Sequence, residues 1–243
     1  MSARSGEFFW QGLKQLLLPG VCWGCNQVLP PERDDLCKDC VARITADPHF
    51  TCPRCSSTVG PYVELPDGCG ECRDVSLGFE RALRLGPYEG RLRDVILRMK
   101  HSSGELLAEA VGELWAAHAE RRLRELGAEA VVPVPLHWLR RWRRGYNQSA
   151  ILARRIARRL RLPFLPRALR RIRSTRRQTD VSPAARRENV RGAFRAVAHP
   201  SLRNRSVLLI DDVMTTGSTA SEAAKALRMA GANRVVVAVL GHG

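Results

Sequence analysis

The feature that most constrains the fold of this chain is the arrangement of its eight cysteines, all of which lie within the first 72 of 243 residues. They form four Cys-x-x-Cys pairs, and each pair places two thiolates on one tight turn, where both can bind the same metal ion. Two pairs complete a tetrahedral zinc site, and four thiolate ligands leave no open coordination position, so such a site is structural. The pairs are Cys22/Cys25, Cys37/Cys40, Cys52/Cys55 and Cys69/Cys72.

The spacing of the pairs favours sequential pairing, in which the first four cysteines bind one zinc ion and the last four bind another. Eleven residues separate the first Cys-x-x-Cys pair from the second, and thirteen separate the third from the fourth, and each spacing is the length of a short hairpin. An interleaved cross-brace of the same pairs stays open at this point. A disulfide framework needs an oxidising compartment, and a thioredoxin-like redox motif needs a βαβ context that this Pro-, Gly- and Asp-rich region lacks. We therefore predict two structural Zn²⁺ sites.

The chain is long enough for one ordinary hydrophobic core and a small module stabilised by zinc. We expect an N-terminal helix and double zinc ribbon in residues 1–75 and a larger domain in residues 76–243. The stretch 8–18 is apolar but contains Lys14, which is typical of an amphipathic helix packed on its own protein. It lacks the basic lead and the cleavage site of a signal peptide, and no other segment approaches the ~20 apolar residues of a membrane span. These features predict a cytoplasmic protein without a membrane span.

The pattern of apolar residues after Cys72 predicts an α/β domain built on a parallel sheet. Continuous apolar runs indicate strands that are covered by helices on both faces, whereas an alternating run indicates an edge strand. Apolar residues at helical spacing, with capping residues at the ends, indicate the helices. We expect an edge strand at 79–88, buried strands at 130–135, 207–210 and 235–240, and helices at about 92–99, 103–127 (with Ser103 as its N-cap), 148–160 and 218–230.

The segment from Val207 to Thr219 combines groups that suit a sugar phosphate. Asp211 and Asp212 follow a buried strand and therefore lie at the carboxyl edge of the sheet, where open α/β folds bind ligands. The sequence Thr-Thr-Gly-Ser-Thr at 215–219 then opens a helix, so backbone N–H groups, hydroxyls and the helix dipole converge where an anion would bind. Carboxylates suit vicinal ribose hydroxyls, and the loop suits a 5′-phosphate. A Walker loop is excluded because no Gly-Lys-Ser/Thr is present.

This segment resembles the phosphoribosyl pyrophosphate (PRPP) binding motif of type I phosphoribosyltransferases, and other motifs narrow the resemblance to the ComF competence family, including its GntX relatives. With the cysteine pairs, the resemblance covers nearly the whole chain. It implies a type I phosphoribosyltransferase fold preceded by a small zinc-ribbon module, and a role in DNA uptake and natural transformation. The further motifs are Val132-Pro-Val-Pro-Leu-His137, Arg144-Gly-Tyr-Asn-Gln148, the stretch 171–178, Arg187-Glu-Asn189 and Gly192-Ala-Phe194.

The resemblance also implies roles for individual residues. Asp211 and Asp212 would hold the ribose of an oxocarbenium-like transition state, and the turn at Pro135 would be the pyrophosphate loop. The stretch 170–192 would be the flexible loop that closes over PRPP and its Mg²⁺, excluding water. An active protein would transfer the phosphoribosyl group to an acceptor, which the sequence does not identify. The implied PRPP-binding residues are Val213, Thr215, Thr216, Gly217, Ser218, Thr219, Pro135, Arg173, Gln178 and Arg187.

Positive charge is concentrated in one segment, since residues 137–195 contain 19 arginines and two acids in a chain of net charge +16. Aromatic residues lie among these arginines, a combination that suits phosphate contacts and base stacking on single-stranded DNA. The alternative hypothesis is therefore a DNA-binding competence protein whose PRPP pocket is regulatory or vestigial, with competence helicase or processing proteins as partners. A solvated Arg-rich face is the competing interpretation. The residues expected to contact nucleic acid are Trp142, Arg143, Arg144 and Tyr146.

Three further residues have two interpretations each. His101 and His137 are candidates for general acids, although a lone histidine is often a surface or core group. Lys100, at the end of an expected helix, matches a lysine common in the ComF family. It either belongs to the site or caps the helix C-terminus.

Overall fold

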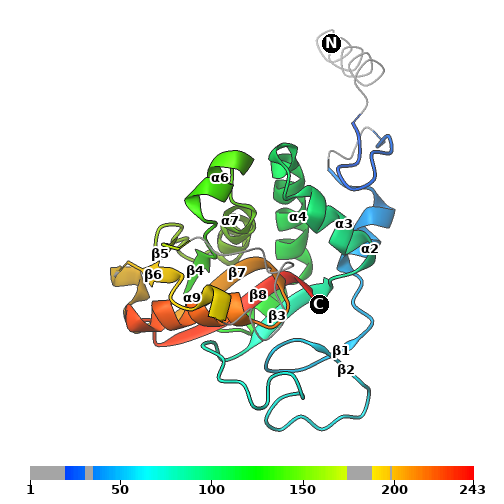
Figure 1. Cartoon of the computed structure of the whole chain (residues 1–243). Helices are drawn as coiled ribbons and strands as arrows, with labels where there is room; N and C mark the ends of the chain where they lie inside the picture. Colours follow the sequence, from blue (N-terminus) through cyan, green and yellow to red (C-terminus); the bar gives the residue numbers. More distant parts are fainter. Residues whose placement is uncertain (1–19, 31–34, 174–187, 198) are drawn as a thin grey trace, which may run out of the picture.

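The centre of the molecule is a four-stranded parallel sheet, shown in Figure 1. The computed structural model describes residues 20–30, 35–173, 188–197 and 199–243. The strand order is β3-β8-β7-β4, so the strand predicted from its alternating pattern does lie at an edge. The bounds are β3 (Ala82–Pro87), β4 (Ala130–Pro133), β7 (Ser206–Met214) and β8 (Arg234–His242), and the two central strands are longer than predicted.

Helices cover both faces of this sheet, as its continuous apolar strands predict. Alternate residues of β7 face opposite sides, because successive side chains of a strand point in opposite directions. Leu208 and Ile210 belong to the core under α3, α4 and α7, whereas Val207 and Leu209 belong to the core under α9 (Figure 1). The helices are α2 (Lys38–Thr45), α3 (Gly90–Arg98), α4 (Glu105–His118), α5 (Glu120–Arg124), α6 (Trp138–Arg144), α7 (Gln148–Leu160) and α9 (Ser218–Met229).

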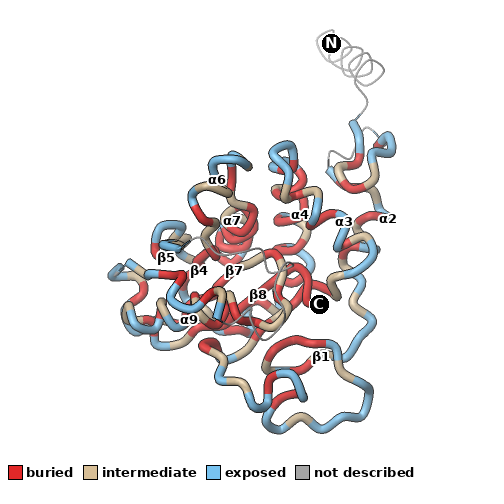
Figure 2. Tube along the Cα trace, in the orientation of Figure 1, coloured by how far each residue is buried: buried red, intermediate tan, exposed pale blue. Residues whose placement is uncertain are grey.

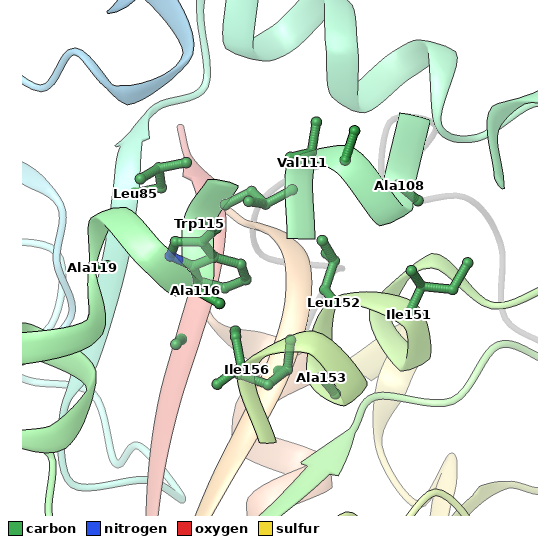
Figure 3. Close-up of a cluster of buried hydrophobic side chains, with 14 of the residues drawn as sticks. Leu85, Ala108, Val111, Trp115, Ala116, Ala119, Ile151, Leu152, Ala153 and Ile156 are labelled. Carbon is green, nitrogen blue, oxygen red and sulfur yellow. The ribbon is translucent and has the colours of Figure 1, made fainter. Parts of the chain in front are cut away.

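The larger core lies between α4, α7 and the sheet, and Trp115 occupies its middle (Figure 3). Trp115 is fully buried, with Val111 on its own helix and Leu152 and Ile156 on α7 beside it. In Figure 2, the tube of the central strands β7 and β8 is mostly buried, whereas α6 has no buried residue.

The predicted helix 103–127 is in fact two helices, α4 and α5, which meet at Ala119. The prediction that Ser103 caps this helix is wrong. A short 3₁₀ turn at Ser102–Gly104 precedes α4, and Gly104 is the N-cap. A side chain at Gly104 has no room, because a Cβ there would lie 2.5 Å from the carbonyl oxygen of Arg98. The turn is therefore packed directly on the end of α3.

Both cysteine-rich modules are packed against the α/β domain. In the first, Cys40 and Ile44 of α2 belong to the same buried cluster as the helices above the sheet. The second contains the short hairpin of β1 (Phe50–Thr51) and β2 (Thr58–Val59) and lies along β3, where Ala82 N donates to Arg54 O over 2.9 Å. The boundary between residues 75 and 76 stays a prediction.

A small antiparallel pair, β5 (Leu169–Arg171) and β6 (Phe194–Ala196), joins the ends of the stretch that the sequence predicts to be a flexible loop. Residues 174–187 of that stretch and the predicted N-terminal helix at 8–18 lie outside the described residues. Within the described part of the chain, every helix is too short or too polar to cross a membrane.

Candidate functional site

The eight cysteines form two clusters that follow the predicted sequential pairing. Cys22, Cys25, Cys37 and Cys40 form one, and Cys52, Cys55, Cys69 and Cys72 form the other, with all sulfur atoms of a cluster within 4.8 Å of one another. The cross-brace alternative does not fit this grouping.

The distances between the sulfur atoms suit zinc. The Cys25–Cys37 and Cys52–Cys72 sulfur pairs are each 3.7 Å apart. A tetrahedral ion with Zn–S bonds of ~2.3 Å would place its ligand sulfurs about 3.8 Å apart. In addition, Cys37 N donates to Cys22 Sγ over 3.2 Å, a contact that favours a thiolate. The donor set and its spacing therefore fit Zn²⁺.

The acidic pair lies near the carboxyl end of β7, and the first turn of α7 supplies each carboxylate with its own donor. Ser149 Oγ donates to Asp211 Oδ1 over 2.9 Å, and Gln148 Nε2 donates to Asp212 Oδ2 over 3.0 Å. Lys100 Nζ lies 3.2 Å from the same Asp212 oxygen. Three segments that are far apart in the sequence therefore converge on the pair, and Lys100 belongs to the site.

The two carboxyl groups have different proton affinities. Burial raises the pKa of Asp211 to about 8, and the neighbouring charge of Asp212 adds to this effect. Burial also acts to raise the pKa of Asp212, but the Lys100 charge and the Gln148 hydrogen bond outweigh it, so that this pKa lies below its usual value. The charge of Asp212 in turn raises the pKa of Lys100. The surroundings therefore favour the protonated form of Asp211 and the ionised form of Asp212, which forms an ion pair with Lys100.

The loop after the acidic pair lines a small cavity beside Asp211. Gly217, at a φ of 69°, is the N-cap of α9, and its left-handed conformation suits glycine. The hydroxyls of Thr216 and Ser218 are 2.7 Å apart, which fixes the start of the helix. The lining of the cavity includes Asp211 and five of the six predicted loop residues, namely Val213, Thr215, Gly217, Ser218 and Thr219, together with Met214, whereas Thr216 does not line it.

The structure places the other predicted PRPP-binding residues away from this cavity or outside its described part. Pro135 lines a separate cleft. Arg173 donates to the carbonyl oxygens of Asn189 and Arg191, so it ties together the two ends of the predicted flexible loop. Gln178 and Arg187 lie outside the described residues.

The residues predicted to contact nucleic acid have different environments. Trp142 and Arg143 are exposed on α6, and Trp142 has 78% of its surface accessible. The Arg144 guanidinium donates to Gln148 Oε1, so this arginine supports the acidic site. Tyr146 is buried, and its hydroxyl donates to Met99 O and lies 3.1 Å from His101 O, so its ring is not available for stacking on a base.

Neither candidate histidine contacts the acidic pair, whereas Ser149, which was not predicted, does. His101 is exposed, and His137 is buried with its ring 5.6 Å from that of Trp138. Ser149 was not among the predicted site residues, although a helix was expected to start near it. A polar pair at the beginning of an otherwise apolar helix face was the available signal.

A parallel sheet with an acidic pair and an anion loop at its carboxyl edge defines a phosphoribosyltransferase-type domain. The family model described as phosphoribosyl transferase domain matches residues 147–242. The chain is 33% identical to competence protein F of Haemophilus influenzae over 89% of its own length and 94% of that protein. It is 32% identical to DNA utilization protein YhgH of Escherichia coli K12, over 91% of this chain and 96% of that one. The chain therefore belongs to the ComF competence family.

Among solved structures, the glutamine PRPP amidotransferase of B. subtilis matches 59% of this chain and 30% of its own. The sequence identity is 24% and the TM-score is 0.41, so this likeness supports no argument of its own.

Proposed function

We propose that this protein binds PRPP together with Mg²⁺ at Asp211, Asp212 and the loop 215–219, and that it acts in DNA uptake during natural transformation. The observation that carries the proposal is the convergence of two separately supported carboxylates and an anion loop on one edge of the sheet. The carboxylates match the hydroxyls of a ribose 5-phosphate, and the loop at the start of the helix matches its phosphate.

The roles of the residues follow from their chemistry. The ionised Asp212 accepts hydrogen bonds from a ribose hydroxyl, and the protonated Asp211 either donates one or loses its proton when the diol binds. The backbone N–H groups at the start of α9 and the hydroxyls of Thr215, Ser218 and Thr219 bind the 5′-phosphate. Mg²⁺, when bound with PRPP, neutralises charge on the pyrophosphate. In the chemical step, the bond between ribose C1 and pyrophosphate would break, pyrophosphate would leave, and C1 would bond to the acceptor, with the positive charge that develops at the ribose stabilised by the acidic pair.

The role in DNA uptake rests on family membership. The two relatives are named competence protein F and DNA utilization protein, and each aligns with nearly the whole chain. A cytoplasmic location and contacts with single-stranded DNA or with competence helicase and processing proteins belong to the same proposal.

Isothermal titration of the zinc-loaded protein with PRPP and Mg²⁺ tests the site. We expect micromolar affinity for the wild type and a loss of about 100-fold or more in Asp211→Asn/Asp212→Asn, because the negative charge of the pair is lost and each amide offers the ribose only one acceptor oxygen. Asp94→Asn, an exposed acid on α3, is the matched control and should bind as the wild type does. A folded wild-type protein that does not bind PRPP would refute the proposal.

A further inference from the structure

A second cleft, of about 650 Å³, lies next to the candidate PRPP site. Its volume falls within the ~300–1,000 Å³ typical of sites for small molecules. It is lined by Pro135 and Leu136 after β4, by parts of α6 and α7, and by residues from the segment 164–171, whereas the residues 211–219 do not contribute to it. The cleft is therefore distinct from the cavity of the anion loop.

The charge of this cleft is strongly positive. Five arginines and a single acid, Glu105, line it. Within the described part of the chain, the guanidinium groups of Arg141, Arg167 and Arg170 are exposed and have neither an ion pair nor a hydrogen bond. Uncompensated cations gathered in a concave site raise the local concentration of anions. The ligand that complements this charge is an anion, such as a phosphate group.

The same cleft also offers apolar and aromatic surface. Trp138 lines it and has 69% of its surface exposed. Phe164, Pro166 and Leu136 provide further apolar lining. A flat aromatic group in the ligand can stack on an exposed indole, while its phosphate contacts the arginines. Phosphate and pyrophosphate have no apolar group that could contact this surface. The cleft therefore favours a ligand that carries both an aromatic ring and an anionic group.

We propose that the cleft binds a nucleotide unit, with its base against Trp138 and its phosphate against Arg141, Arg167 and Arg170. The unit is either a free nucleoside 5′-phosphate or one nucleotide of single-stranded DNA, because both present the same chemistry.

The cleft adjoins the PRPP site through two connections. Pro135 follows β4, which pairs directly with β7, the strand of the acidic pair. Arg171, which lines the cleft and stacks on Phe194, also interacts electrostatically with Asp211. A nucleotide in the cleft therefore lies beside PRPP, although its binding does not require PRPP.

The test measures binding of deoxythymidine 5′-monophosphate by calorimetry and of a fluorescein-labelled oligo(dT) by anisotropy, with the full zinc-loaded chain. We expect the triple variant Arg141→Ala/Arg167→Ala/Arg170→Ala to lower affinity about 10-fold or more, and Trp138→Ala to lower it about fivefold or more. The control triple variant Arg93→Ala/Arg158→Ala/Arg203→Ala removes equal charge from exposed positions that do not line the cleft, and it should change affinity less than about twofold. Since all these residues are exposed, each variant should fold, which its thermal unfolding verifies.

The outcomes separate the sources of the ligand and the two proposals. Binding of both probes with similar affinity identifies a free nucleotide as sufficient, and binding of the oligonucleotide alone identifies single-stranded DNA. If the wild-type protein binds the nucleotide but does not bind PRPP, the proposed PRPP site is overturned and the proposed nucleotide cleft is supported. Two results would overturn the nucleotide cleft. In the first, the two triple variants lose affinity equally. In the second, pyrophosphate displaces the nucleotide and Asp211→Asn/Asp212→Asn abolishes its binding.

Discussion

Lys100 Nζ lies 3.2 Å from Oδ2 of Asp212, and this ion pair connects the end of α3 to the acidic pair on β7. The residues on either side of the lysine are held in place, because the Tyr146 hydroxyl donates to Met99 O and lies 3.1 Å from His101 O. A cation is thus built into the site before any ligand arrives. Its physical effect is to keep Asp212 ionised in a place where burial alone would protonate it.

Replacing Lys100 should therefore weaken PRPP binding through the acidic pair. In Lys100→Met, the pKa of Asp212 rises, the two carboxyl groups compete for one charge, and we expect affinity for PRPP with Mg²⁺ to fall about 10-fold or more. Lys100→Arg keeps the charge and should retain most of the affinity. Calorimetry across pH 6 to 9 measures this, and the loss in Lys100→Met should shrink at high pH. Wild-type affinity in Lys100→Met at every pH would show that the lysine has no part in the site.

The raised pKa of Asp211 predicts how stability depends on pH. The folded protein holds this proton up to about pH 8, against an ordinary pKa of 3.8, so the stabilisation is complete below the ordinary value and is lost as the pH rises through 8. Between pH 6.5 and 8, the free energy of unfolding should fall by up to about 1.4 kcal/mol per pH unit. Asp211→Asn stays neutral, so its decline over this range should be smaller and it should be the more stable protein at pH 8.

Urea unfolding of the zinc-loaded proteins measures both slopes. The range above pH 6.5 is chosen because burial lowers the pKa of His242 to about 4, and His242 therefore contributes mainly at lower pH, with the opposite sign. Parallel slopes in the wild type and in Asp211→Asn would contradict the assignment.

Most of the fold was predictable because its signals are local. Continuous apolar runs indicated the parallel sheet, and the Cys-x-x-Cys spacing indicated the two clusters. The ends of β7 and β8 were not predictable in the same way, because polar or small residues end the apolar runs while the backbone continues to pair, as Val213 does with Gly241 and Met214 with His242. Backbone hydrogen bonds form regardless of side-chain polarity, so hydrophobic patterns underestimate such strands.

The site was predictable only where it is contiguous in the sequence. The carboxylates and the anion loop follow one another along the chain, whereas Ser149 reaches Asp211 across 62 positions through the packing of α7 on the sheet. No periodicity reports such a contact. The count of arginines was also misleading as a measure of available charge, because Arg154 and Arg155 are paired with Glu109, and Arg159 is paired with Glu120.

Gly104 should be essential for the position of Lys100. A Cβ at this residue would lie 2.8 Å from Met99 Cα and 2.7 Å from the Tyr146 hydroxyl oxygen, so both Met99 and Tyr146 would have to move. We expect Gly104→Ala to destabilise the protein by about 1–3 kcal/mol and to weaken PRPP binding beyond the effect of stability alone. Gly70→Ala, where a Cβ meets nothing within 4 Å, is the control. Thermal unfolding and calorimetry measure the two effects, and a Gly104→Ala protein as stable as the control would contradict the packing argument.

The attachment of the second zinc module to β3 depends on a buried ion pair. Arg84, with 1% of its surface exposed, donates from Nε to Asp47 Oδ2 over 2.9 Å, and from Nη1 to Thr58 Oγ1 over 2.8 Å. Arg84→Met leaves the carboxylate of Asp47 buried without its partner, which should cost about 3–5 kcal/mol. The double variant Arg84→Met/Asp47→Leu removes both charges, and we expect it to recover much of this loss because no uncompensated charge remains.

The same comparison shows whether this pair stabilises the whole protein or only the module. If the attachment is local, Arg84→Met should accelerate zinc release to a chromogenic chelator from one of the two sites while the other site keeps its wild-type rate. Urea unfolding then supplies the free energies for the two variants and the wild type. A single variant as stable as the wild type would mean that water reaches Asp47 readily and that the module does not depend on the pair. A double variant no more stable than the single one would assign the loss to the hydrogen bond with Thr58 rather than to the buried charge.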